Sequence, residues 1–229
     1  MNILAFDTST ENCSVALLRG DELSGDAVLA GQRHSELLLP MIDALLKQRG
    51  ASLPALDGIA FSAGPGSFTG LRIACGVAQG LAFGAGLPVA GISTLLALAE
   101  AATVEGKPAV RVIACLDARM GEVYHAAYEK RDGQWLTRSE PGLYKASQAP
   151  GVSGDDWVGC GSGFAVHSAA LGTRYSGQLA HVYADSYPQA TAIATLAAAD
   201  FSRGGGRGAA LAAPLYIRNK VALTLTERS

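Results

Sequence analysis

The stretch Ile3-Leu4-Ala5-Phe6-Asp7, a polar connector and the apolar run Cys13-Ser14-Val15-Ala16-Leu17-Leu18 together predict the two strands of a β-hairpin. The same pattern returns as Ala114-Cys115-Leu116-Asp117, a second connector and Tyr124-His125-Ala126-Ala127. In both copies an apolar strand ends in an aspartate, and the two aspartates lie 110 residues apart, about half the chain. This spacing predicts an internal duplication into two α/β lobes, each with a mixed sheet and flanking helices.

Helical and strand patterns fill the chain between the two hairpins. Apolar residues from Leu37 to Leu46 recur every three or four positions, which predicts an amphipathic helix ending near Gly50. Further patterns predict a strand at 58–62, a helix at 69–85, a strand at 89–92 and a helix at 95–102. We expect lobes at residues 1–105 and 106–190, followed by a C-terminal helix and tail, 191–229, that packs back toward the first lobe.

The composition is apolar for a globular chain. Of the 229 residues 49% are hydrophobic and only 17% are charged, whereas about 25% charge is usual. So little charge indicates an apolar surface that a partner covers. The net charge of −2 argues against binding nucleic acid through bulk electrostatics.

The cysteines and the uncharged segment 73–99 indicate the cellular compartment in which the protein acts. The four cysteines (Cys13, Cys75, Cys115, Cys160) are far apart in apolar or glycine-rich runs, which predicts buried free thiols. The chain opens directly on a strand pattern, so we expect no signal peptide and a cytoplasmic protein. Glycines and Pro88 interrupt the uncharged segment, which favours helix, turn and strand over a membrane span.

The segment Ser62-Ala63-Gly64-Pro65-Gly66-Ser67-Phe68-Thr69-Gly70-Leu71-Arg72 predicts a strand, a glycine loop and a helix start. Such a loop can present backbone N–H groups to an anion, although the glycines could equally make only a tight turn. Asp7 could hold a magnesium-bound phosphate or accept backbone N–H bonds in its own turn; for Asp117 we expect the second role. The candidate nucleotide or anion site comprises Asp7, Thr8, Ser9, Gly64, Gly66, Ser67, Gly161 and Gly163.

Six segments together resemble the TsaB (YeaZ) family. They are Ala5–Ser9, Arg33–Pro40, Ser62–Arg72, Gly91–Leu95, Leu116–Tyr124 and Pro214–Arg218. The resemblance implies an actin-like fold of the ASKHA superfamily, a heterodimer with the catalytic paralogue TsaD and recruitment of the ATPase TsaE. It further implies a supporting role in threonylcarbamoyl transfer to the adenosine 3′ of the tRNA anticodon, with tRNA bound only indirectly.

Catalytic equipment is missing from the expected places. The catalytic relative carries a HxxxH metal pair where this chain has residues 93–99, which include no His, Asp or Glu. Ala118, Arg119 and Met120 would obstruct a phosphate loop. His34, Ser35 and Glu36 cannot form a triad, because adjacent residues do not face one another on a helix. We expect no metal, no catalytic residue and no cofactor, apart from ATP or ADP bound weakly or at the complex interface. A stand-alone metal-dependent hydrolase, an ATPase or a small-molecule sensor remains the alternative.

The predicted helix at 69–85 carries the positive evidence. After Arg72 it has no charge, and Gly76, Gly80 and Gly84 form a stripe that allows another helix to approach closely. We expect it to pair with a partner's helices, and to form a homodimer when the chain is alone. The candidate interface comprises His34, Leu37, Leu38, Met41, Leu45, Thr69, Arg72, Ile73, Gly76, Val77, Gln79, Gly80, Phe83 and Gly84.

Overall fold

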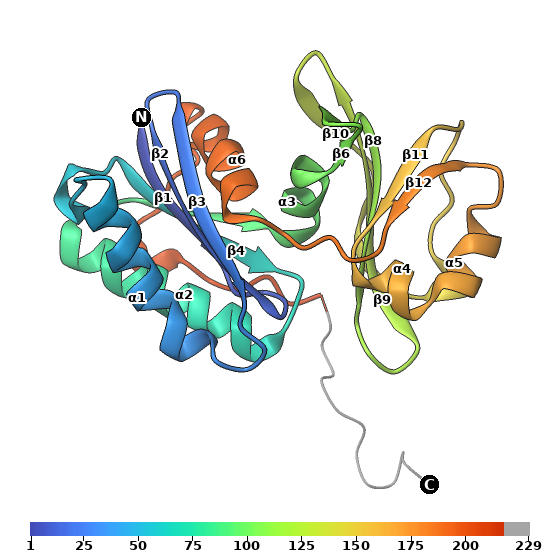
Figure 1. Ribbon diagram of the computed structural model, residues 1–229, viewed down its shortest axis with the longest axis horizontal. Coiled ribbons are helices and arrows are strands. Elements are labelled where there is room, and N and C mark those ends of the chain that lie inside the picture. Colours follow the sequence, from blue (N-terminus) through green and yellow to red (C-terminus); the bar gives the residue numbers. More distant parts are fainter. Residues whose placement is uncertain (218–229) are drawn as a thin grey trace, which may run out of the picture.

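The computed structural model describes residues 1–217 and shows two lobes side by side, each built on a five-stranded sheet (Figure 1). The first sheet has the order β3-β2-β1-β4-β5, and the second has the order β10-β9-β8-β11-β12. The strands are β1 (Asn2–Asp7), β2 (Asn12–Arg19), β3 (Glu22–Leu29), β4 (Gly58–Gly64), β5 (Val89–Ser93), β8 (Arg111–Asp117), β9 (Glu122–Arg131), β10 (Gln134–Lys145), β11 (Trp157–Cys160) and β12 (Leu179–Tyr183).

Both sheets use one topology. In each, the first two strands form an antiparallel hairpin, the third extends it, and the last two run parallel to the first. The internal duplication into two α/β lobes, predicted from the repeated hairpin, is therefore confirmed. A short hairpin of β6 (Thr103–Val104) and β7 (Lys107–Pro108) lies in the first connection between the lobes.

The third strand of each sheet, β3 and β10, was not predicted. Every residue of β3 is exposed except the half-buried Ser24. An edge strand of this kind is held mainly by backbone bonds to its neighbour, so its side chains need not alternate between apolar and polar. The hydrophobic pattern from which strands are predicted is accordingly weak in these segments.

Helices cover both faces of the first sheet (Figure 1). The helices α1 (His34–Gln48) and α2 (Phe68–Ala85) pack on one face, over a core that includes Phe6 and Phe61. The other face receives α6 (Ala190–Ser202), whose Ile193 packs with Ile3. The limits of α2 follow from its sequence: the Ser67 hydroxyl accepts from the Gly70 N–H, and Gly86 ends the helix in the left-handed conformation at φ 69°.

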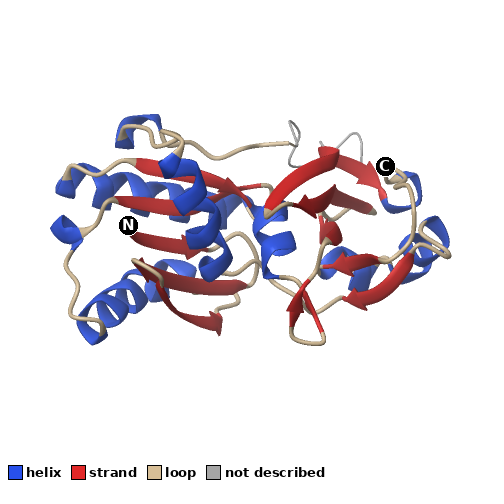
Figure 2. Ribbon diagram, turned by 90° about the horizontal axis from the view of Figure 1, so that it is seen from above, coloured by secondary structure: helices blue, strands red, loops and turns tan. Residues whose placement is uncertain are grey.

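The helix α3 (Thr94–Ala101) lies between the lobes and belongs to both cores. Its Ala97 packs with the α6 side of the first lobe, whereas Leu95 and Leu98 pack with the second sheet. An apolar helix with protein on both sides needs no polar face, which explains its sequence. In Figure 2 this helix lies at the junction of the two sheets.

The second lobe is completed by α4 (Ser162–Val166) and α5 (Ser168–Arg174), whose Phe164 and Leu171 pack with Ile113 and Trp157 of the sheet. A buried polar chain crosses this core: the Tyr175 hydroxyl lies 2.9 Å from both His125 Nε2 and the Pro150 carbonyl. Because the hydroxyl has one proton and the carbonyl can only accept, the imidazole Nε2–H donates to Tyr175.

The last described part of the chain returns to the first lobe. Residues 207–217, here called the C-terminal strap, begin at a β-bridge between Arg207 and Val89 and run along α2. Residues 218–229, with the basic Arg218, Lys220 and Arg228, lie outside the described part. Within residues 1–217 no helix combines the length and apolarity needed to cross a membrane.

Candidate partner-binding surface and interlobe cleft

The helix α2 has an inner and an outer face of different character. Leu71, Ala74, Ala78 and Ala82 face the sheet and are buried. The three glycines of the stripe face outward, since a Cβ added at Gly76, Gly80 or Gly84 would meet no atom within 4 Å. Core packing therefore does not explain the stripe.

Two elements flank this outer face. The strap touches α2 on one side, where Ala212 O accepts from Gln79 Nε2 at 2.8 Å and from Cys75 Sγ at 3.4 Å. On the other side α2 packs against α1. The open face between them carries Ile73, Val77 and Phe83, and the Phe83 side chain is 84% exposed.

Three residues of the predicted interface are instead buried. His34, Leu38 and Leu45 are 6%, 1% and 5% exposed and lie on the inner side of α1. The His34 ring is 3.4 Å from the Asn12 carbonyl, so it links α1 to the first hairpin. A partner cannot reach these side chains while the lobe stays folded, and they are removed from the interface.

Two further predicted interface residues are engaged within the chain. Gln79 anchors the strap, as described above. Arg72 lies over the Phe68 ring, 3.7 Å from its centroid, and its Nε donates to the Tyr216 hydroxyl at 3.0 Å. The remaining interface candidates are accessible. Half-buried are Leu37, Met41, Ile73 and Val77, and exposed are Thr69, Gly76, Gly80, Phe83 and Gly84.

The connector of the first hairpin is packed tightly onto the glycine loop. The Thr8 hydroxyl donates to Gly70 O at 2.7 Å, and the Ser67 N–H donates to Ser9 O at 2.7 Å. A Cβ added at Gly66 would lie 2.5 Å from Ser9 O. The backbone of the hairpin connector thus occupies the space beside the glycine loop that a bound phosphate would need.

Asp7 lies beneath this contact and is fully buried. Its carboxylate accepts from the Ser9 N–H at 3.0 Å and from the Ser9 hydroxyl at 2.8 Å. Burial raises the pKa of Asp7 to about 6, despite the opposing hydrogen bonds from Ser9. Of the two roles left open for Asp7, the structure shows the one in which the carboxylate organises its own turn.

The burial of Asp7 makes folding depend on pH. Its folded pKa of about 6 exceeds the ordinary 3.8, so the folded chain keeps this proton where the unfolded chain has lost it. Asp7 therefore stabilises the fold most below about pH 4, and the free energy of unfolding falls by roughly 3 kcal/mol as the pH rises through 6.

We expect the variant Asp7→Asn to lack this decline, as measured by urea unfolding between pH 4 and 7. His125, whose pKa is lowered by burial to about 4, titrates with the opposite sign but is common to both proteins. Equal pH slopes in the wild type and the variant would contradict the assignment.

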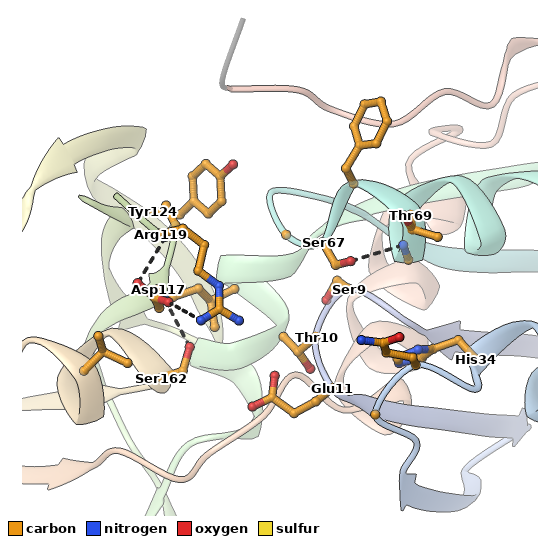
Figure 3. Close-up of a pocket in the computed structure, with 18 of the residues that line it drawn as sticks. Ser9, Thr10, Glu11, His34, Ser67, Thr69, Asp117, Arg119, Tyr124 and Ser162 are labelled. Atoms are coloured by element: carbon orange, nitrogen blue, oxygen red, sulfur yellow. Dashed lines mark hydrogen bonds and ion pairs between the residues drawn. The ribbon is translucent and has the colours of Figure 1, made fainter. Parts of the chain in front are cut away.

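A cleft of about 1080 Å³ separates the lobes (Figure 3). Of the predicted anion-site residues only Ser9, Gly66 and Ser67 line it. Gly161 and Gly163 face the second lobe instead, where an added Cβ would lie within 3 Å of Cys115 atoms. The side chains labelled around the cleft are Ser9, Thr10, Glu11, His34, Ser67, Thr69, Asp117, Arg119, Tyr124 and Ser162.

The charge of Asp117 is matched within its own lobe. Arg119 Nη1 lies 3.3 Å from Asp117 Oδ2, and His167 Nε2 lies 3.2 Å from Oδ1. The Arg119 N–H also donates to this carboxylate, as expected for an aspartate in a hairpin turn. No local pattern points to His167, because its partner lies 50 residues away in the chain. Within residues 1–217 no three His, Cys, Asp or Glu side chains are grouped as metal ligands.

Comparisons with known proteins agree with this architecture. The family model described as tRNA N6-adenosine threonylcarbamoyltransferase, TsaD, matches residues 28–223. The chain is 38% identical to the tRNA threonylcarbamoyladenosine biosynthesis protein TsaB of Escherichia coli, over 97% of this chain and 96% of that protein. The Haemophilus influenzae protein of the same name is 37% identical over 96% and 95%. The solved structure of YeaZ from Pseudomonas aeruginosa superposes with a TM-score of 0.87 at 38% identity, covering 94% of this chain and 99% of that one.

The fold and the matches define the class first: a two-lobed α/β protein related to the threonylcarbamoyltransferases. Within that class, the chain belongs to the TsaB (YeaZ) family. This family takes part in the biosynthesis of threonylcarbamoyladenosine in tRNA.

Proposed function

We propose that the chain is the non-catalytic scaffold subunit of this pathway. It binds the transferase paralogue TsaD through α1 and α2, and the resulting complex recruits the ATPase TsaE and contacts tRNA. The observation that carries the proposal is the outer face of α2, where three glycines and the phenylalanine Phe83 are exposed to solvent. With four buried free thiols, we propose that it acts in the cytoplasm.

The energetics of α2 favour a covered face. Each glycine inside a helix lowers stability by about 0.5–1 kcal/mol relative to alanine, so a solvent-facing stripe brings the folded monomer no benefit. Glycine does benefit a contact, because it lets two helix backbones approach closely. The stripe is therefore explained by a function in association.

The transferase paralogue fits this face through its shared fold. The matching family model includes the segments that form α1 and α2 here. Two chains of one fold can place the same helix pair against each other about an approximate two-fold axis. The same geometry gives a homodimer when the chain is alone, and the paralogue then competes with the second copy. Roles for TsaE and tRNA rest on the family alone.

Two features of the cleft support a role without chemistry. Asp7 is buried beneath its own loop and does not face the cleft. Asp117 is paired with Arg119 and His167. In the described residues, both aspartates that end the repeated strands are thus engaged in internal contacts.

Sedimentation tests the scaffold proposal. The isolated chain should sediment as a dimer, and equimolar TsaD from the same organism should convert it to a one-to-one heterodimer. Competition is the specific expectation, because both partners use one surface. A stable monomer that binds no paralogue would remove the proposed function.

The size of the cleft supports a second candidate, an ATPase or a metal-dependent hydrolase. The isolated chain is incubated with ATP and Mg²⁺ or Zn²⁺, and phosphate release is followed. We expect release no faster than in buffer. Repeated turnover that co-purifies with the chain would contradict the scaffold proposal and show that the chain is an enzyme.

A further inference from the structure

The C-terminal strap borders the open face of α2 along its length. It begins beside Val89, just beyond the end of α2, and its Leu215 N–H donates to Ala63 O at 2.6 Å, just before α2 begins. The strap therefore runs antiparallel to the helix. The α2 residues that hold it, Arg72, Cys75 and Gln79, are spaced three and four apart and so lie on one side of α2.

Helical geometry places the glycine stripe next to this strap. Successive residues of a helix are rotated by about 100° around its axis. Gly76 is therefore the stripe residue nearest to the strap, and Gly80 and Gly84 lie progressively closer to α1. Phe83 lies at the border with the strap. The strap presents large apolar side chains that the core does not use: Leu211, Leu215 and Tyr216 are 69%, 48% and 44% exposed.

We infer that the strap is the second flank of the partner surface, so that a partner helix lies between α1 and the strap and contacts both. The inference rests on the proposed function and extends it to residues 207–217. Gln79 and Arg72 are then positioning residues that hold the strap, not contacts to the partner.

The occupant is the α2-equivalent helix of the TsaD paralogue. The absence of charge on this surface supports an apolar helix as the occupant: α2 from Ile73 to Ala85 and the strap from 208 to 217 carry no charged side chain. A charged helix would lose hydration there without gaining a partner, whereas an uncharged one would not. The matching family model spans α1, α2 and the strap, so a transferase chain presents the corresponding elements.

The test measures the affinity of full-length variants for the purified TsaD of the same organism. Leu211→Asp should lower the affinity at least about 10-fold, because it places a charge in an apolar contact. Val182→Asp is the matched control: Val182 is 48% exposed on β12 of the second lobe, and the affinity should stay within about 2-fold, as for surface changes outside an interface.

Gln79→Leu tests the anchoring. This variant keeps the side-chain bulk but loses the bond to Ala212 O, so it should weaken binding and speed hydrogen exchange at the Leu215 N–H. Weaker binding with unchanged exchange would show that Gln79 contacts the partner itself, which overturns the positioning role.

Gly80→Arg separates the inference from the proposed function. If it abolishes binding while Leu211→Asp does not, the α2 face is the interface but the strap is no part of it, and the inference fails alone. If Gly80→Arg binds like the wild type, the partner surface lies elsewhere and both fail.

Discussion

Gly80→Arg is expected to lower the affinity for TsaD at least about 100-fold, by nearly 3 kcal/mol. The outer face of α2 is uncharged from Ile73 to Ala85, and a Cβ at Gly80 points into open space. A guanidinium there would stand where the partner helix approaches and would lose its hydration without gaining a partner.

The fold itself should tolerate this arginine. Arginine is a better helix former than glycine by somewhat less than 1 kcal/mol, so the unfolding free energy of the monomer should be unchanged or slightly raised. Urea unfolding at concentrations too low for dimerisation checks this point. Lost binding with an intact fold distinguishes an interface residue from a structural one.

Gly172→Arg is the matched control. Gly172 lies inside α5 of the second lobe, is exposed, and likewise has no atom within 4 Å of an added Cβ. The two variants add the same charge at equivalent local positions. Equal losses of affinity in both would point to a general charge effect and against the α2 face.

Gly70→Ala is expected to lower the free energy of unfolding by about 3 kcal/mol or more. A Cβ at this position would overlap the Thr8 carbonyl oxygen, a backbone atom that cannot rotate away. Either α2 or the connector of the first hairpin must move. The bond from the Thr8 hydroxyl to Gly70 O is then lost as well.

Gly76→Ala, six residues further along the same helix, is expected to have the opposite effect. Here an added methyl group meets nothing, so the monomer should gain about 0.5–1 kcal/mol. Urea unfolding of both variants under one condition gives the comparison. A Gly70→Ala protein within 1 kcal/mol of the wild type would mean that the contact with Thr8 is looser than described.

Elements with strong local patterns were predictable from the sequence. Both hairpins lie where the Asp7 and Asp117 patterns placed them, and α2 begins one residue before the predicted start. Ser67 and Gly86 explain the accuracy at α2, since a capping hydroxyl and a left-handed glycine are local signals.

The inner side of α1 was not predictable in the same way. Leu37, Leu38, Leu39 and Met41 leave the helix apolar around much of its surface, so periodicity alone does not show which side meets the sheet. His34, Leu38 and Leu45 were assigned to the partner for this reason. The contacts of the strap and of His167 depend on residues far away in the chain, which no local pattern encodes.

The first lobe is made of the two ends of the chain, and this has a consequence for biosynthesis. Ile3, Ala5 and Ala60 are covered by α6, which begins at Ala190. A ribosome adding about 5–20 residues per second needs roughly 6–25 s to translate residues 65–189. During that interval the nascent sheet lacks the cover that α6 provides, so the first lobe to be translated is the last to be completed.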